Sequence, residues 1–185
     1  MFLSHKIIKD GVLQSVLPAT TGFGFLYFSD MIPPFKPKNV LILGYGLGTT
    51  AQLIKKIWGE VDIMGVDSEM YPNRFKLDFF AQADIKTFLP EIDPLVGYDY
   101  IIIDIFNGAQ IPEFVMSKEF VEGIINLNPK LIAINTFHEP ASEIMHEWDE
   151  AFYTSFWKTN SMGNTIHFYS PDAYFDPVKQ GKRIS

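Results

Sequence analysis

The sequence predicts an α/β fold in which helices cover both faces of a mostly parallel sheet. From residue 37 onward, apolar segments of strand length alternate with segments of helical pattern. Such alternation is typical of parallel strands joined by crossover helices. The segment at residues 100–104 begins with four apolar residues, as a strand buried on both faces should. A glycine-rich turn directly after the first of these strands is the third observation.

The expected elements follow one another along the chain. Strands are expected at residues 39–43, 61–66, 78–82, 100–104, 131–135, 156–159 and 165–169. Helices are expected at residues 49–58, 85–89, 117–125 and 141–153, the third of them capped by Ser117. The gap between the second and third strands is short and contains Pro72, so we expect this crossover to be stunted or irregular. The last two strands should form a closing hairpin.

The N-terminal part differs from the rest in pattern. Residues 1–17 alternate loosely around Asp10-Gly11, a dipeptide typical of hairpin turns. Prolines between residues 33 and 37 separate this part from the first core strand. We therefore expect a hairpin and connecting segment at residues 1–36, a nucleotide-binding domain at residues 37–175 and a polar tail at residues 176–185.

Composition excludes several classes of function. A net charge of −7 argues against a nucleic-acid partner, because neutralising phosphates requires clustered Lys and Arg. The absence of cysteine excludes disulfides and thiol catalysis and fits a reducing compartment, so a cytoplasmic location is expected. No apolar run approaches the ~18 residues of a membrane-spanning helix, so no membrane partner is expected. The four histidines are scattered without metal-ligand spacing, so no metal is expected.

The glycine-rich turn is the most informative stretch. Gly44, Gly46 and Gly48 follow the first strand, and a helical pattern begins at Thr49. A strand, a tight glycine turn and a helix start form a nucleotide-binding unit, because glycine lets the main chain turn sharply and approach a ligand. The dinucleotide fingerprint places its third glycine at the sixth position, which is Thr49 here. The spacing therefore favours an S-adenosylmethionine-type site over an NAD site.

Three carboxylates stand at or just beyond the ends of expected strands. They are Asp67, Asp84 and Asp104. Ligands of open α/β sheets bind beyond the carboxyl ends of the strands. We expect Asp67 to hold ribose hydroxyls, Asp84 to accept from an adenine amino group, and Asp104 to stand beside the group that is transferred. The alternative for each is that it caps the next helix or turn.

These segments, taken in order, resemble the spermidine synthase family of polyamine aminopropyltransferases over most of the chain. Besides the glycine turn and Asp67, the matching segments are Lys9-Asp10-Gly11-Val12-Leu13-Gln14-Ser15, Asp30-Met31-Ile32, residues 84–89 and 98–104, Ile111-Pro112 and Lys118-Glu119-Phe120, with Asn135 at the end of strand five. The resemblance implies a Rossmann-like methyltransferase fold. Its features are a mostly parallel seven-stranded sheet, a C-terminal antiparallel hairpin and a small N-terminal β-hairpin.

The resemblance also implies a reaction. Decarboxylated S-adenosylmethionine would bind over the glycine turn as co-substrate, with its ribose on Asp67 and its adenine near Asp84. A small-molecule amine would attack the carbon beside the sulfonium, and Asp104 would accept the amine's proton. Gln14 would face the active site.

The acceptor side departs from the family pattern. The catalytic loop, usually Asp-Ser-Ser-Asp, reads Asp104-Ile105-Phe106-Asn107, so Asn107 replaces the acid that holds the far ammonium of a diamine. An amide can hydrogen-bond an ammonium but does not neutralise it. The family's active-site tyrosine aligns with Phe28, although a shift of one residue would bring Tyr27 to that position.

Three functions therefore stay open at this point. The first is a transferase similar to aminopropyltransferases. The second is an S-adenosylmethionine-dependent methyltransferase with another acceptor. The third is a catalytically silent relative that binds or assembles. A homodimer is compatible with each of them.

Overall fold

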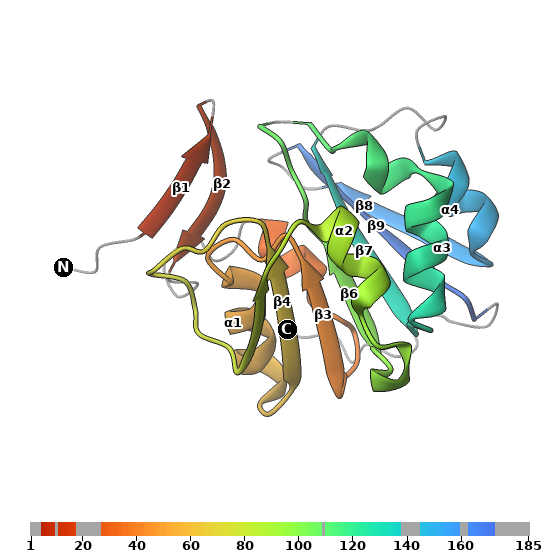
Figure 1. Ribbon diagram of the computed structural model, residues 1–185, viewed down its shortest axis with the longest axis horizontal. Coiled ribbons are helices and arrows are strands. Elements are labelled where there is room, and N and C mark those ends of the chain that lie inside the picture. The colour runs from red at the N-terminus through yellow and green to blue at the C-terminus, as the bar shows by residue number, and fades with distance from the viewer. Residues whose placement is uncertain are drawn as a thin grey trace.

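A seven-stranded sheet and a separate two-stranded hairpin form the framework of the molecule (Figure 1). The computed structural model describes residues 5–9, 11–17, 27–108, 110–137, 145–159 and 163–172. The hairpin consists of β1 (His5–Lys9) and β2 (Val12–Leu17), which pair antiparallel. The strands of the large sheet are β3 (Asn39–Leu43), β4 (Asp62–Asp67), β5 (Phe79–Gln82), β6 (Tyr100–Ile103), β7 (Leu131–Phe137), β8 (Thr154–Thr159) and β9 (Asn164–Ser170).

The large sheet has the order β5-β4-β3-β6-β7-β9-β8. The first five strands in this order, β5, β4, β3, β6 and β7, are mutually parallel. Strand β9 runs antiparallel to both β7 and β8. The predicted architecture, a mostly parallel seven-stranded sheet that ends in an antiparallel hairpin and carries a small hairpin before it, is therefore confirmed.

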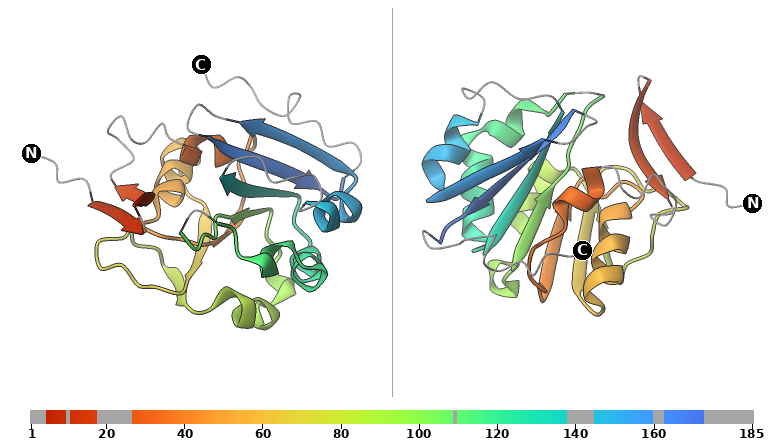
Figure 2. Two further views of the ribbon diagram at one scale, coloured as in Figure 1. Left: turned by 90° about the horizontal axis from the view of Figure 1, so that it is seen from above. Right: turned by 180° about the vertical axis from the view of Figure 1, so that it is seen from behind.

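Helices lie on both faces of this sheet, as the two further views show (Figure 2). One face carries α1 (Thr49–Trp58) and the 3-10 helix η2 (Tyr27–Met31). The other carries α2 (Ile85–Phe88), α3 (Lys118–Asn126) and α4 (His146–Ala151). Short 3-10 helices complete the connections: η3 (Leu89–Glu91), η4 (Pro94–Val96) and η5 (Glu113–Met116).

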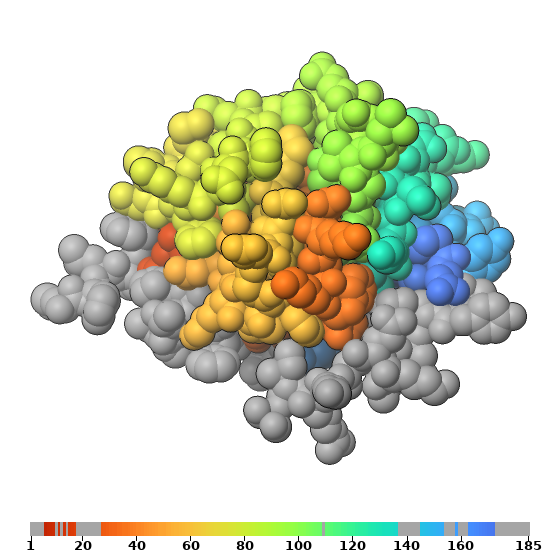
Figure 3. Space-filling view, turned by 90° about the horizontal axis from the view of Figure 1, so that it is seen from below, coloured from red at the N-terminus to blue at the C-terminus, as the bar shows by residue number. Residues whose placement is uncertain are grey.

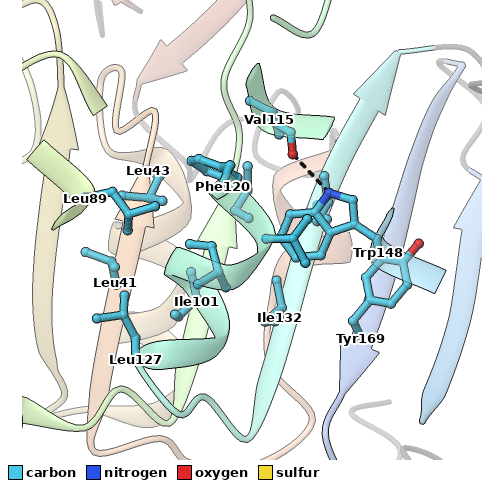
Figure 4. Packing of buried hydrophobic residues seen from close by; sticks show 14 of the residues in the cluster. Leu41, Leu43, Leu89, Ile101, Val115, Phe120, Leu127, Ile132, Trp148 and Tyr169 are labelled. Carbon is cyan, nitrogen blue, oxygen red and sulfur yellow. Dashed lines mark hydrogen bonds between the residues drawn. The ribbon is translucent and has the colours of Figure 1, made fainter. Parts of the chain in front are cut away.

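Each face has its own apolar core because successive side chains of a strand point to opposite sides. Ile42 of β3 packs in the core beneath α1, whereas Leu41 and Leu43 pack in the core beneath α3. The second core is anchored by Trp148 of α4, whose Nε1 donates to the Val115 carbonyl at 3.0 Å (Figure 4). Satisfying this donor lets a large amphipathic ring be fully buried.

Some boundaries match the prediction, and most others differ from it by one or two residues. Helix α1 has the predicted bounds, and Ser117 caps α3 by accepting from the Phe120 amide at 3.3 Å. Residues 68–78, all of them described, contain no helix, so the predicted irregular crossover is confirmed. Strand β7 continues two residues beyond the predicted end because β9 pairs with it as far as Phe137. Of the helix expected at residues 141–153, only His146–Ala151 is helical, and residues 141–144 lie outside the described part.

The segment that connects the hairpin to the large sheet packs into the first of the two cores, beneath α1. Tyr27, Phe28 and Met31 of η2 are buried in this core, and Tyr100 Oη of β6 donates to the Met31 carbonyl at 2.8 Å. The division at residue 36 remains a prediction.

The hairpin stands over the end of the sheet at which the parallel strands finish (Figure 1). Figure 3 looks onto the opposite end, where the parallel strands begin and the hairpin is largely hidden behind the molecule. Among the described residues, no helix is both long enough and apolar enough to cross a bilayer.

Candidate functional site

A cavity of about 100 Å³ lies between the hairpin and the carboxyl ends of the central strands. The glycine turn forms one wall, and Asp67 from the end of β4 and Asp104 from the end of β6 also line it. The structure therefore brings together two of the three predicted carboxylates and all three predicted glycines. This is the position at which open α/β sheets bind ligands.

Each glycine of the turn is required for a different steric reason. Gly44 has φ 86°, and a Cβ there would lie 2.2 Å from the Asp104 carbonyl oxygen. Gly46 has φ 54°, and its Cβ would lie 3.1 Å from Ser15 Oγ of the hairpin. The predicted reason for Gly46 was close approach to a ligand. In this structure, the atoms nearest to a Cβ on Gly46 belong to Ser15 of the hairpin. The sequence of the turn does not indicate this contact.

Tyr45 fixes the turn from within the core. A Cβ on Gly48 would lie 2.3 Å from the Tyr45 hydroxyl, and one on Gly65 of β4 would lie 2.5 Å from its ring. The Tyr45 hydroxyl donates to the Phe75 carbonyl at 2.7 Å. Glycine at both positions therefore makes room for a buried ring that ties the turn to the irregular crossover.

Asp67 binds the glycine turn directly. Its Oδ2 accepts from the Gly46 amide at 2.7 Å, and its Oδ1 accepts from the Glu69 amide at 3.0 Å. These bonds are of the turn-capping kind that formed the alternative interpretation of a strand-end Asp. Asp67 nevertheless lines the cavity beside the turn, which is the place of a ribose-binding carboxylate in the predicted site.

Asp104 is held by two side chains from other elements. Its Oδ1 accepts from Asn135 Nδ2 of β7 at 2.7 Å, and its Oδ2 accepts a longer bond of 3.4 Å from the hydroxyl of Tyr27. Burial raises the pKa of Asp104 to about 7, although both hydrogen bonds lower it, and the nearby charge of Asp67 raises it further. A carboxyl group with a pKa near neutrality can exchange a proton with a reactant at physiological pH.

Of the two aromatic residues that could occupy the position of the family's active-site tyrosine, Tyr27 is the one that bonds Asp104. Burial, followed by the charge of Asp104, raises the pKa of Tyr27 well above its usual value, so its hydroxyl stays a donor. Phe28 lines the cavity, with its ring centroid 4.1 Å from that of Tyr27. Of the two positions that the sequence left open, Tyr27 bonds Asp104 and Phe28 lines the cavity. Two adjacent aromatic residues in a helical turn give no periodic signal that would assign these positions in advance.

Three predicted residues are not placed in the cavity. Asp84 is exposed and caps α2 by accepting from the Lys86 amide at 2.9 Å, while its neighbour Ile85 lines the cavity. Asn107 is exposed and bridges to Gln110 through the backbone, and Ile105 and Phe106 line the cavity instead. Gln14 belongs to β2, but its side chain lies outside the described part.

The hairpin is bonded across the glycine turn. Ser15 Oγ accepts from the Leu47 amide at 3.1 Å, and the Thr49 hydroxyl donates to the Val16 carbonyl. At the cavity rim, Lys9 forms an ion pair with Glu69, and the Tyr71 hydroxyl donates to the same carboxylate at 2.7 Å.

The contacts of Glu69 with Lys9 and Tyr71 were not predicted from the sequence, and they change the pKa of Glu69. The hydrogen bond from Lys9 is the main cause that lowers the pKa of Glu69. Nothing in the local sequence signals the pairing, since it joins residues 60 positions apart.

The chain was compared with known proteins. No family model matches it. Over 135 residues it is 27% identical to a polyamine aminopropyltransferase of Vibrio vulnificus (strain CMCP6), and the match covers 65% of this chain and 44% of that protein. The chain thus spans under half the length of this curated relative.

Solved structures extend the comparison to the fold. A spermidine synthase in complex with the transition-state analogue AdoDATO superimposes with a TM-score of 0.69 at 16% identity, over 94% of this chain and 68% of that chain. Human methyltransferase-like protein 13 in complex with SAH gives a TM-score of 0.60 at 14% identity, over 75% of this chain and 73% of that chain. The methyltransferase-like Rossmann fold and the resemblance to aminopropyltransferases are confirmed.

Proposed function

We propose that this protein is a transferase that binds an S-adenosylmethionine-type co-substrate over the glycine turn and transfers an aminopropyl group to a small amine. The sequence relative is a polyamine aminopropyltransferase, and a spermidine synthase of the same fold binds the analogue AdoDATO. The observation that carries the proposal is the convergence of Asp67, Asp104 and the glycine turn on one cavity.

Asp104 supplies the acid–base chemistry in this proposal. A primary amine has a pKa of about 10 and is mostly protonated at neutral pH, so it must lose a proton before it attacks. Because burial raises the pKa of Asp104 to about 7, the carboxylate is a stronger base than an ordinary Asp, and a substantial fraction of it is ionised at neutral pH. The attack forms the new C–N bond, breaks the C–S bond of the sulfonium, and leaves the amine's proton on Asp104.

The charges of the cavity suit this chemistry. Asp67 and Asp104 line it, and carboxylates favour both a sulfonium cation and an ammonium ion. Lys9 also lines it, but its charge is balanced by the ion pair with Glu69. The cavity of about 100 Å³ is smaller than the roughly 300–1,000 Å³ of typical ligand sites, so ligand binding in this proposal widens it.

A methyltransferase is the second candidate, and the acceptor side favours it. Ile105 and Phe106 line the cavity next to Asp104, where the family loop usually has serines. Asn107 is exposed and outside the cavity, so it would not replace the acid that holds a diamine. An apolar acceptor pocket suits a less polar acceptor than a diamine.

Parallel calorimetric titrations test these functions. The ligands are S-adenosylmethionine, its decarboxylated form and methylthioadenosine. Tighter binding of the decarboxylated form supports aminopropyl transfer, and tighter binding of the intact form supports methyl transfer. If none of the three ligands gives a heat of binding, the result supports the third function, a catalytically silent relative.

A further inference from the structure

The buried side of Asp104 is occupied by two amides in series. Asn164 Nδ2 at the start of β9 donates to Asn135 Oδ1 at 3.0 Å, and Asn135 Nδ2 donates to Asp104 Oδ1 at 2.7 Å. The series has one direction, because an amide nitrogen can only donate and an amide oxygen can only accept. Each amide therefore fixes the orientation of the next group toward the cavity.

Both asparagines are costly where they stand. Asn135 is 1% exposed and Asn164 is 6% exposed, and Asn135 follows a run of four fully buried apolar residues in β7. A buried amide is tolerated when its hydrogen bonds are made, and apolar residues would fill the same space without that requirement. Because they are bonded in series to a carboxylate that lines the cavity, their presence points to a role in the site.

The geometry also distinguishes the two oxygens of Asp104. A proton on Oδ1 would face the Asn135 amide nitrogen, which cannot accept it, and would break the shorter bond. Among the described residues, Oδ2 accepts the longer 3.4 Å bond from Tyr27, whose hydroxyl can accept as well as donate. A proton is therefore accommodated at Oδ2.

We propose that Asn135, held in turn by Asn164, is a positioning residue that confines proton uptake by Asp104 to its Oδ2 oxygen. The catalytic meaning of this arrangement rests on the proposed function, in which Asp104 receives the proton of the amine. The hydrogen-bond series itself does not depend on that function.

The other charged and titratable groups near Asp104 come from different elements. Tyr27 of η2 bonds its Oδ2, and the charge of Asp67 at the end of β4 acts on it through space. Lys9 of β1 and Tyr71 of the irregular crossover line the same cavity. None of these belongs to β7 or β9, so substitutions at Asn135 and Asn164 leave them in place.

The test is a carbon-13 NMR titration of the Asp104 carboxyl group in the full chain without ligand. Asn135→Leu keeps the branched shape of the side chain and removes the donor, and it should raise the titration midpoint by about one to two pH units. Asn164→Ala should raise it by less, because Asn135 keeps its bond but loses its anchor.

Thr136→Val is the matched control, because Thr136 is fully buried on the same strand and donates to the Thr165 carbonyl at 3.0 Å. It should leave the midpoint unchanged. An unchanged midpoint in folded Asn135→Leu overturns the proposal and leaves a structural role. If that variant does not fold, Asn164→Ala decides by the same criterion.

A second readout separates this proposal from the proposed function. In an active enzyme, Asn135→Leu should move the rising limb of the pH–rate profile to higher pH while co-substrate affinity stays unchanged. A wild type that binds no adenosyl ligand contradicts the proposed function but leaves the titration, and with it the positioning role, open to measurement.

Discussion

At the position of Asp104, the cost of burying a charge and, in the proposed function, the need to accept a proton act on the same side chain. Burial raises its pKa, and the hydrogen bonds from Asn135 and Tyr27 oppose that rise without cancelling it. The result is a group whose charge changes near neutrality. Such a group affects the stability of the fold as well as its chemistry, because the folded and unfolded states bind different numbers of protons.

The first prediction concerns stability and pH. The pKa of Asp104 is about 7 in the folded state and about 3.9 in the unfolded chain, so between those values the folded state binds more protons. Its contribution to the free energy of unfolding therefore falls as pH rises through that window. Asp104→Asn removes this contribution, so its stability relative to wild type should increase from about pH 5 to about pH 8. Urea unfolding at both pH values measures the difference, and a pH-independent difference contradicts the raised pKa.

The second prediction concerns catalysis by the same group. If amine acceptors are used, Asp104→Asn should lower turnover by about 100-fold or more, which is the usual contribution of a general base. Affinity for the co-substrate should change little, because Asp67 and the glycine turn are intact. Steady-state kinetics and calorimetry on the same preparation separate the two effects. Lost co-substrate binding would instead make Asp104 part of the nucleotide site.

The third prediction concerns Asp67. Asp67→Ala should weaken binding of an adenosyl ligand by about 1.5–3 kcal/mol, the usual contribution of hydrogen bonds to a charged group. Asp62→Ala, at the exposed start of the same strand, is the matched control and should bind normally. Calorimetry gives both affinities. Equal affinities in two folded variants would rule out a ribose contact.

At the scale of elements, two neighbours determine the conformation of the glycine turn. Backbone of the segment after β6 lies against Gly44, and the hairpin lies against Gly46. The turn is therefore fixed before any ligand arrives. A preorganised turn lowers the entropic cost of binding.

The fourth prediction compares two glycines that both have positive φ. Gly44 has φ 86° and Gly59, after α1, has φ 76°, so a Cβ is strained at both. A Cβ at Gly59 meets nothing within 4 Å, whereas at Gly44 it meets backbone. Gly44→Ala should therefore destabilise the fold clearly more than Gly59→Ala, as measured by thermal unfolding. Equal losses would mean that the β6 end moves aside without cost.

At the scale of the whole molecule, the site is assembled from segments far apart in the chain. The hairpin, the glycine turn, the end of β4 and the end of β6 all contribute to the cavity. An unfolded chain has no such arrangement, so a ligand of this cavity binds the folded state alone and stabilises it.

The fifth prediction follows from that linkage. An adenosyl ligand at about 100 times its dissociation constant should add about 2.7 kcal/mol to the stability. For a chain of 185 residues, this corresponds to a rise in Tm of about 5–10 °C. Scanning fluorimetry with the three adenosyl ligands measures it, with inorganic phosphate as a control that lacks the nucleoside. No rise at saturating concentration would contradict binding in this cavity.

The sequence by itself determined the sheet, the glycine turn and the strand-end carboxylates. These depend on local properties, such as apolar runs, glycine spacing and Pro72 in the irregular crossover, and the seven-stranded architecture with its small N-terminal hairpin followed from the resemblance. Only the tertiary structure decided that the Tyr27 hydroxyl bonds Asp104, that the hairpin lies against Gly46, and that Asp84 and Asn107 do not line the cavity. The first two are contacts between segments far apart in the chain, which leave no periodic pattern in the sequence. Asp84 and Asn107 make local bonds, and only the packing of the whole chain decides whether a residue at such a position also reaches the cavity.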